Sequence, residues 1–423
     1  MRTVLMMGLA ALLAAATAHA ELQSVAVGGS LRIRGNLYDW DDAFDDLAFV
    51  EQRTRLNVKA DFSDQVAAFI EMDSYDRWGE DFRSRYVTGA DAAAWTGDDA
   101  EVYQAYIEAN AMWGVPLRLR AGRQELSFGN EWLIGVNDRS AFFRGLSFDA
   151  IRLTYATDLV NVDVLAAKLA ETFSDFADDD ADLYGVYGTY RGLDDIVIDG
   201  YWLFVRDEQA GIGYDVDLHT VGLRGGGNIG RFDFETELAR QFGDIEWRLG
   251  DYDYDEWGGN LELGYRFEFQ CRPRIYVGFA YLGGDSRDLS FNRMFSNVEY
   301  SEFLDDTSLS NALVYRAGLS GMASERIELG LDLRYIEADD QLRKGWFLGY
   351  WEHGGDDANG FETHLHGTYR YSEDLIFRAG WAHFIAEGGV EEGNLILGNG
   401  LLRFVADEDD EYDYLFVESK LTF

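Results

Sequence analysis

The chain has 423 residues, of which 47% are hydrophobic and 15% aromatic, and its formal net charge is −41 at pH 7. This hydrophobic content excludes a disordered acidic chain, and the negative charge argues against nucleic-acid binding, which needs a basic surface. Forty-six glycines and only two prolines favour a continuous β architecture, and a single cysteine excludes an internal disulfide.

The first residues have the features of a secretory signal peptide. Arg2 supplies a positive charge, residues 4–16 are apolar, and residues 18–20 form an A-x-A cleavage site. We therefore expect residues 1–20 to be removed on export and residues 21–423 to form a single domain. Beyond this segment no apolar run reaches the roughly 18 residues of a membrane-spanning helix, so helical spans are excluded.

Alternation of apolar and polar residues, typical of strands with one apolar face, dominates the remaining chain. The first two strands are expected at residues 30–38 and 49–61, and each places basic side chains on its polar face. These side chains are Arg32, Arg34, Arg53, Arg55 and Lys59. Further strands are predicted at about residues 66–73, 102–112, 117–123, 147–155, 160–164, 183–191, 196–206, 216–227, 231–243, 257–269, 274–284, 311–320, 326–338, 360–371, 375–386 and 412–423.

Two features of these strands indicate one closed barrel. Short turns alternate with long loops, and the strands number about eighteen, an even number typical of outer-membrane barrels. Each strand has about ten residues, enough to cross a bilayer when tilted. The chain ends in Phe423, and such a terminal aromatic resembles the assembly signal of bacterial outer-membrane barrels. We predict an all-β transmembrane antiparallel barrel with short periplasmic turns and long external loops. A soluble sandwich, propeller or solenoid is the alternative, but the repeat typical of the last two is missing.

Residues 121–153 stand out between two predicted strands, because about twenty of them neither alternate nor have a helical period, and such long loops usually carry function. Arg123 with Glu125, and Asp149 with Arg152, are close enough in sequence for local ion pairs. Our hypothesis is that this external loop folds inward and narrows the pore; the alternative is a loop that only covers the barrel mouth. The loop residues of interest, whose glycines allow tight bends, are Gly122, Glu125, Gly129, Asn130, Gly135 and Asp149.

This stretch also carries a family resemblance. Gly122–Gly135 (GRQELSFGNEWLIG) and Ser147–Leu153 (SFDAIRL) resemble the alginate-export porin family, and Gln52–Asp64 (QRTRLNVKADFSD) and Gln104–Asn110 (QAYIEAN) add to the likeness. Beyond these early strands the resemblance rests on the barrel pattern and the strand count. It implies an outer-membrane barrel that passes a linear polysaccharide, with alginate as the founding example, through an arginine-rich lumen.

The basic residues near this loop are the candidate substrate pathway. Guanidinium groups bind carboxylates through two parallel hydrogen bonds, and a row of such groups gives many weak sites, as conduction requires. The alternative is that they pair with lumen acids such as Glu51, Glu71, Asp73 and Glu108 and only make the wall rigid. The pathway candidates are Arg32, Arg34, Arg53, Arg55, Lys59, Arg118, Arg120, Arg123 and Arg152.

Later strands place acidic residues on the lumen face, which predicts a lumen that is basic on one side and acidic on the other. Neutral sugars or small solutes therefore remain open as substrates. These acids are Asp233, Glu235, Glu237, Glu262, Glu268, Glu328, Asp332 and Glu362.

We expect a passive outer-membrane pore for an acidic polysaccharide such as alginate. A general or sugar-uptake porin is the alternative, and an adhesin or receptor is another. No catalytic residues, cofactor or metal site are expected: no Ser–His–acid set is evident, and His364 and His366 lack an evident third ligand. The expected partners are outer-membrane lipid and the solute, with periplasmic export components as a further candidate and no nucleic acid. The acidic loops are a candidate for divalent cations that bridge to lipid headgroups.

Overall fold

The structure is a computed structural model, which describes the chain in thirteen stretches. The signal-peptide prediction lies outside them. The described residues are 22–40, 46–63, 65–79, 100–138, 143–171, 179–209, 214–247, 250–284, 290–305, 309–344, 350–352, 355–392 and 408–423.

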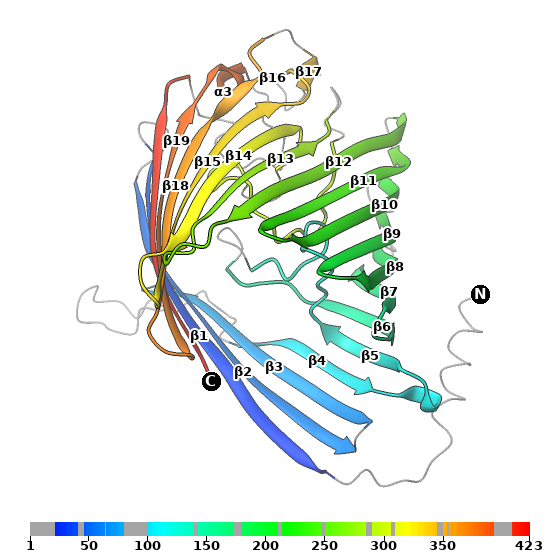
Figure 1. Ribbon diagram of the computed structural model, residues 1–423. Helices are drawn as coiled ribbons and strands as arrows, with labels where there is room; N and C mark the ends of the chain where they lie inside the picture. Colours follow the sequence, from blue (N-terminus) through cyan, green and yellow to red (C-terminus); the bar gives the residue numbers. More distant parts are fainter. Residues whose placement is uncertain are drawn as a thin grey trace, which may run out of the picture.

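Eighteen antiparallel strands form one closed barrel (Figure 1). Each strand pairs with the next along the chain, and the first strand closes the cylinder by pairing with both the second and the last. The strands are β1 (Ser24–Asp39), β2 (Leu47–Ser63), β3 (Val66–Arg77), β4 (Glu101–Ala109), β5 (Leu117–Gln124), β6 (Phe148–Ala156), β7 (Val160–Glu171), β8 (Asp179–Leu193), β9 (Ile196–Gln209), β10 (Tyr214–Ile229), β11 (Phe232–Trp247), β12 (Gly250–Arg266), β13 (Arg274–Leu282), β14 (Ala312–Met322), β15 (Ile327–Ala338), β18 (Ala358–Arg370), β19 (Leu375–Ala386) and β20 (Glu411–Thr422).

Among the described residues, a small hairpin, a short helix and a 3-10 turn lie outside the barrel sheet. A hairpin of β16 (Leu342–Lys344) and β17 (Tyr350–Glu352) and the short helix α3 (Gly388–Glu392) belong to the long-loop end, and the 3-10 turn η1 (Met112–Gly114) belongs to a short connection. No helix in the described stretches is long and apolar enough to cross a membrane. The predicted barrel class and strand number are confirmed.

Several strands are longer than predicted, because pairing continues where the apolar alternation stops. The clearest case is the hairpin of β11 and β12, where Asp244 faces Asp253 and Glu246 faces Asp251. Acidic residues in these extensions removed the apolar signal that marks a membrane-crossing strand.

The two faces of the wall differ as the alternation predicts. Large apolar side chains such as Leu37, Leu56 and Val58 are exposed on the outer face, where lipid would cover them, while Arg32 and Arg53 are buried on the inner face. Polar residues can face inward because the lumen offers them charged partners, whereas the outer face must be apolar in lipid.

Two long loops fold into the barrel and fill part of it. The first inner loop, described over residues 125–138 and 143–147, joins β5 to β6, and the second inner loop, described over residues 283–284, 290–305 and 309–311, joins β13 to β14. Their backbones meet in a short parallel bridge: the Phe295 N–H donates to the Leu133 carbonyl and the Gly135 N–H to the Phe295 carbonyl, both at 2.9 Å.

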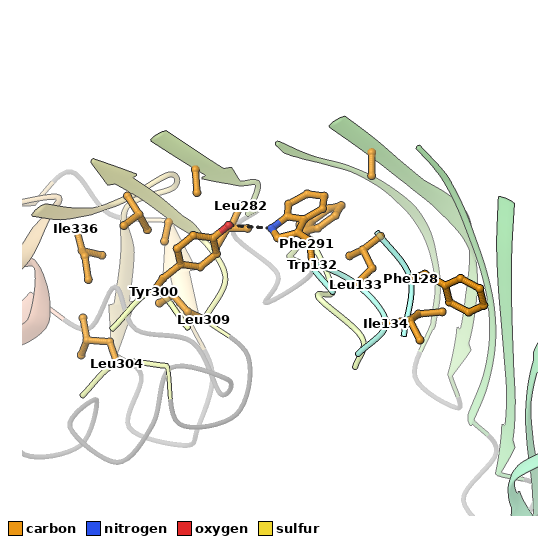
Figure 2. Packing of buried hydrophobic residues seen from close by; sticks show 14 of the residues in the cluster. Phe128, Trp132, Leu133, Ile134, Leu282, Phe291, Tyr300, Leu304, Leu309 and Ile336 are labelled. Carbon is orange, nitrogen blue, oxygen red and sulfur yellow. Dashed lines mark hydrogen bonds between the residues drawn. The ribbon is translucent and has the colours of Figure 1, made fainter. Parts of the chain in front are cut away.

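Apolar packing joins these loops to one another and to the wall (Figure 2). The Trp132 ring, which is 1% exposed, stacks on Phe291 with centroids 5.3 Å apart, and its Nε1–H donates to the Tyr300 hydroxyl at 2.9 Å. Phe128 stacks on Tyr187 of β8. The inner wall beneath the loops carries an apolar patch, and its buried residues include Leu165, Leu183, Leu203, Ala239, Ala280 and Leu282.

Glycine is required where the first inner loop approaches the wall. Gly129 has a φ of +58°, and a Cβ there would lie 2.6 Å from the Tyr187 hydroxyl and 2.9 Å from Arg224. Gly122, at the end of β5, has a φ of +127°, and a Cβ would lie 2.2 Å from the Ala105 carbonyl oxygen. Gly122 and Gly129 thus have the backbone conformation of a bend, whereas Gly135 has no positive φ and instead allows close approach of Asn297.

Candidate permeation pathway

Strands β1 and β2 bring four predicted arginines together on the inner face of the barrel. Their register places Arg32 opposite Arg53, and all four side chains point inward because residues two apart share a face. We call Arg32, Arg34, Arg53 and Arg55 the basic wall. Each is at most 8% exposed, so none of them is a freely solvated lumen charge.

Wall carboxylates neutralise part of this charge. Glu418 of β20 accepts from Arg32 Nε at 2.8 Å and from Arg34 Nε at 2.9 Å, and Arg378 of β19 lies 3.7 Å from it. Arg55 donates to Asp73 of β3 at 3.1 Å. Structural pairing, the alternative to pathway lining, therefore accounts for part of the basic wall.

The first inner loop supplies a further carboxylate, Asp138, from within the lumen. Its Oδ1 accepts from Arg32 at 2.5 Å and from Arg53 at 2.7 Å. Burial on its own raises the pKa of Asp138, but the guanidinium groups of Arg32 and Arg53 outweigh burial and hold the pKa below its ordinary value. Asp138 is therefore ionised in the neutral pH range.

The same loop also covers the basic wall with an aromatic ring. The Phe143 ring centroid lies 4.2 Å from the Arg32 guanidinium carbon and 5.3 Å from that of Arg34. The Phe143 carbonyl accepts from Arg53 at 2.8 Å. Cation–π contacts of this kind are stronger when the cation is desolvated, so the ring helps to fix the loop against the wall.

Glu125, at the start of the first inner loop, also contacts this region. It accepts from the Tyr103 hydroxyl at 2.8 Å and from Arg55 at 3.3 Å, and burial raises its pKa. Asn130 is exposed beside Gly129 at the turn of the loop.

Four other predicted pathway residues lie on the inner face away from the basic wall. Arg120 pairs with Glu108 at 2.7 Å, Arg152 with Asp163 at 2.8 Å, and the half-exposed Lys59 with Asp61 at 3.1 Å. Arg118 faces Thr154 across the strand pair β5–β6. These residues extend the basic character of the early strands, but the structure does not bring them to the basic wall.

The placement of Arg123 in the pathway is wrong. Arg123 continues the outward face of Leu119 and Ala121, and its Nε donates to Asp149 at 2.8 Å, with both side chains about half exposed. The predicted local pairs of Arg123 with Glu125 and of Asp149 with Arg152 are also wrong. Cross-strand neighbours pair instead, because residues at opposed positions share a face of the sheet.

The expected acidic side of the lumen also carries arginines, which are not among the predicted pathway residues. Their acidic partners are Asp233 for Arg274, Glu235 for Arg224, Glu262 for Arg274 and Arg316, and Glu362 for Arg334, all within 3.5 Å. The lumen is therefore not divided into one basic and one acidic half. The sequence pattern could have revealed these arginines, because each lies an even number of residues from lumen-facing residues of the same strand.

A cavity of about 460 Å³ lies between the basic wall and strands β15, β18 and β19. It is the space left beside the two inner loops, and its lining mixes both signs of charge. Its residues include Arg32, Arg34, Asp138, Glu299, Glu302, Asp332, Arg334, His364, His366, Arg378 and Phe416. Over the described stretches, no three histidine, cysteine or acidic side chains are grouped to hold a metal.

A closed eighteen-stranded antiparallel barrel, apolar outside, charged inside and narrowed by inward-folded loops, has the architecture of the outer-membrane porins. The sequence model for the alginate export family matches residues 23–335, so the chain belongs to that family. The predicted resemblance is confirmed. No curated protein sequence matches the chain significantly.

Solved outer-membrane proteins share the fold. OccAB1 of Acinetobacter baumannii is 10% identical, with a TM-score of 0.61 over 96% of this chain and 99% of the other. OpdO of Pseudomonas aeruginosa is 10% identical, with a TM-score of 0.60 over 96% and 98%. OccK11 (OpdR) of Pseudomonas aeruginosa is 12% identical, with a TM-score of 0.56 over 94% and 96%. At these identities the likeness establishes the fold.

Proposed function

We propose that this protein is a passive outer-membrane pore that carries an acidic polysaccharide such as alginate. The observation that supports the proposal most directly is the basic wall, because Arg32 and Arg34 line the cavity beside the two inner loops. Membership of the alginate export family supports the same substrate class.

The two inner loops fill part of the lumen and leave a cavity beside the basic wall. Where the two inner loops pack on the apolar patch of the inner wall, a charged solute would lose its hydration, so it would be excluded from that contact. The polar cavity offers a route lined by charged groups. A uronate chain on this route meets Arg32, Arg34, Arg334 and Arg378, which together attract carboxylates without one deep trap.

A general or sugar-uptake porin is the second candidate function. It is favoured by the acids that line the same cavity, among them Asp332, and by the pairing of most lumen arginines with carboxylates. Such a mixed lining suits neutral sugars, which would need hydrogen-bonding groups of both kinds rather than net charge.

Planar-bilayer recording of the purified protein separates the two candidates. If the pore carries a polyanion, its conductance should favour anions and linear oligouronates should block it in a concentration-dependent way. Maltotriose should block it more weakly than a uronate trisaccharide. Strong cation selectivity with no block by oligouronates would overturn the polyanion proposal and favour the alternative.

A further inference from the structure

We propose that Asp138 occupies a carboxylate-binding subsite of the pore and that a passing uronate must displace it. The subsite is the pair of guanidinium groups on Arg32 and Arg53. This inference rests on the proposed function, because it assigns to one loop residue the control of carboxylate affinity in that pathway.

The local pairing of Arg32 and Arg53 leaves this subsite open to an additional anion. Among the described residues, Asp138 is the only carboxylate within ion-pair distance of Arg53. Arg32 has one wall carboxylate, Glu418, which it shares with Arg34 and Arg378. Without Asp138, buried Arg53 would have no carboxylate within ion-pair distance among the described residues, and Arg32 would have only a share of Glu418, a state that favours capture of an anion.

The geometry of the subsite is that of carboxylate recognition. Oδ1 of Asp138 lies 2.5 Å from Arg32 Nη1 and 2.7 Å from Arg53 Nη1, and Oδ2 lies 3.4 Å from Arg53 Nη2. Buried Arg53 Nε has no partner in the described part of the chain, so this guanidinium keeps capacity for a further acceptor. A uronate carboxylate has the same two oxygens and can take over these bonds directly.

The Asp138 carboxylate can leave the arginine pair while the loop backbone stays in place. Its backbone N–H donates to the Asn297 side-chain oxygen of the second inner loop at 2.6 Å, which holds the main chain independently of the carboxylate. Its side chain is 23% exposed and lines the cavity, whereas Arg53 is 2% exposed and does not line it. A rotation of the Asp138 side chain would therefore let an incoming carboxylate reach both arginines.

Asp138 then sets the affinity of the pore. An arginine pair without Asp138 would bind each uronate carboxylate tightly and slow the passage of the polymer. The Asp138 carboxylate competes for the same pair and so lowers its affinity for each uronate. Removing one charge-assisted bond partner changes affinity by about tenfold or more. The residue therefore favours throughput over binding.

The test compares Asp138→Asn with the wild-type pore and with Asp332→Asn, which removes a cavity charge that contacts His366 and Tyr276 rather than the arginine pair. A linear uronate trisaccharide is titrated on each channel in planar bilayers, with maltotriose as the neutral probe. We expect Asp138→Asn to lower the half-blocking uronate concentration about tenfold or more and Asp332→Asn to lower it less than threefold. Maltotriose block should not change.

A double variant keeps the test decisive. If the uronate carboxylate binds Arg53, the stronger uronate block expected for Asp138→Asn should disappear in the double variant that combines Asp138→Asn with Arg53→Gln. Equal uronate block in wild type and Asp138→Asn, or an equal gain with Asp332→Asn, would refute the subsite while leaving the polyanion pore intact. Absence of uronate block in every conducting channel would instead refute the proposed function itself.

Discussion

Replacing Trp132 by alanine tests whether the two inner loops narrow the pore together. The side chain is 1% exposed, stacks on Phe291 and donates to the Tyr300 hydroxyl. Truncating a buried tryptophan typically costs about 3–5 kcal/mol, and a loss of about 4 kcal/mol changes an equilibrium constant roughly a thousandfold. Because Trp132 joins the first inner loop to Phe291 and Tyr300 of the second, this loss should fall on loop docking.

The assay is single-channel conductance, with Trp257→Ala as the matched control. Trp257 lies on β12, faces outward and is 45% exposed, so its removal affects lipid contact and not the lumen. We expect Trp132→Ala to raise the mean conductance and to add brief transitions between levels as the loops separate, while Trp257→Ala keeps the wild-type conductance.

A specific result would refute this reasoning. If Trp132→Ala forms a folded barrel with the wild-type conductance distribution, while hydrogen exchange shows the Gly135 and Phe295 amides deprotected, then the loops separate without widening the pore. Some other part of the lumen would then set the conductance.

Three further predictions follow from the loop and the wall. Gly129→Ala should weaken loop docking by about 1–3 kcal/mol, because it adds strain at positive φ and a clash with Tyr187, and it should raise conductance noise as Trp132→Ala does. Because the pKa of Asp138 is lowered in the folded protein, its ion pairs stabilise the docked loop fully above the ordinary aspartate pKa of about 4 and are lost as pH falls through the lower folded value. Hydrogen-exchange protection of the first inner loop should therefore be constant from about pH 5 to 8 and should fall below about pH 4. The Asp138→Asn variant should not show this fall. Arg123→Ala removes a half-exposed outward ion pair, so ion selectivity should not change, whereas Arg53→Gln should reduce anion preference.

The barrel and the basic wall could be predicted because both depend on a period of two. Arg32 and Arg34 share a face whatever their neighbours are, and the alternation of turn and loop lengths decides which strands are adjacent. The same rule places Arg123 on the outer face with Ala121, so that error came from grouping residues by charge instead of following the alternation.

The pairing of side chains could not be predicted in the same way, because it depends on register. Bulges shift the register between β2 and β3 at Asp61 and between β3 and β4 at Glu71, so a partner cannot be counted from sequence distance. The contact between the inner loops is less predictable still. It joins Trp132 to Phe291 and Tyr300, more than 150 residues away, through packing that has no local sequence signal.

The apolar patch of the inner wall favours inner loops that stay docked inside the barrel. Leu183, Leu203 and Leu282 point into the lumen and are at most 1% exposed, so withdrawal of the loops would expose these side chains to water. At about 25 cal/mol per Å² of apolar surface, even a few hundred Å² would cost several kcal/mol. Large loop withdrawal is therefore unfavourable, and control of permeation is expected from side chains at the edge of the loops. Asp138 is a loop carboxylate that contacts the basic wall at Arg32 and Arg53, and its displacement would uncover charge on these two arginines without exposing the apolar patch.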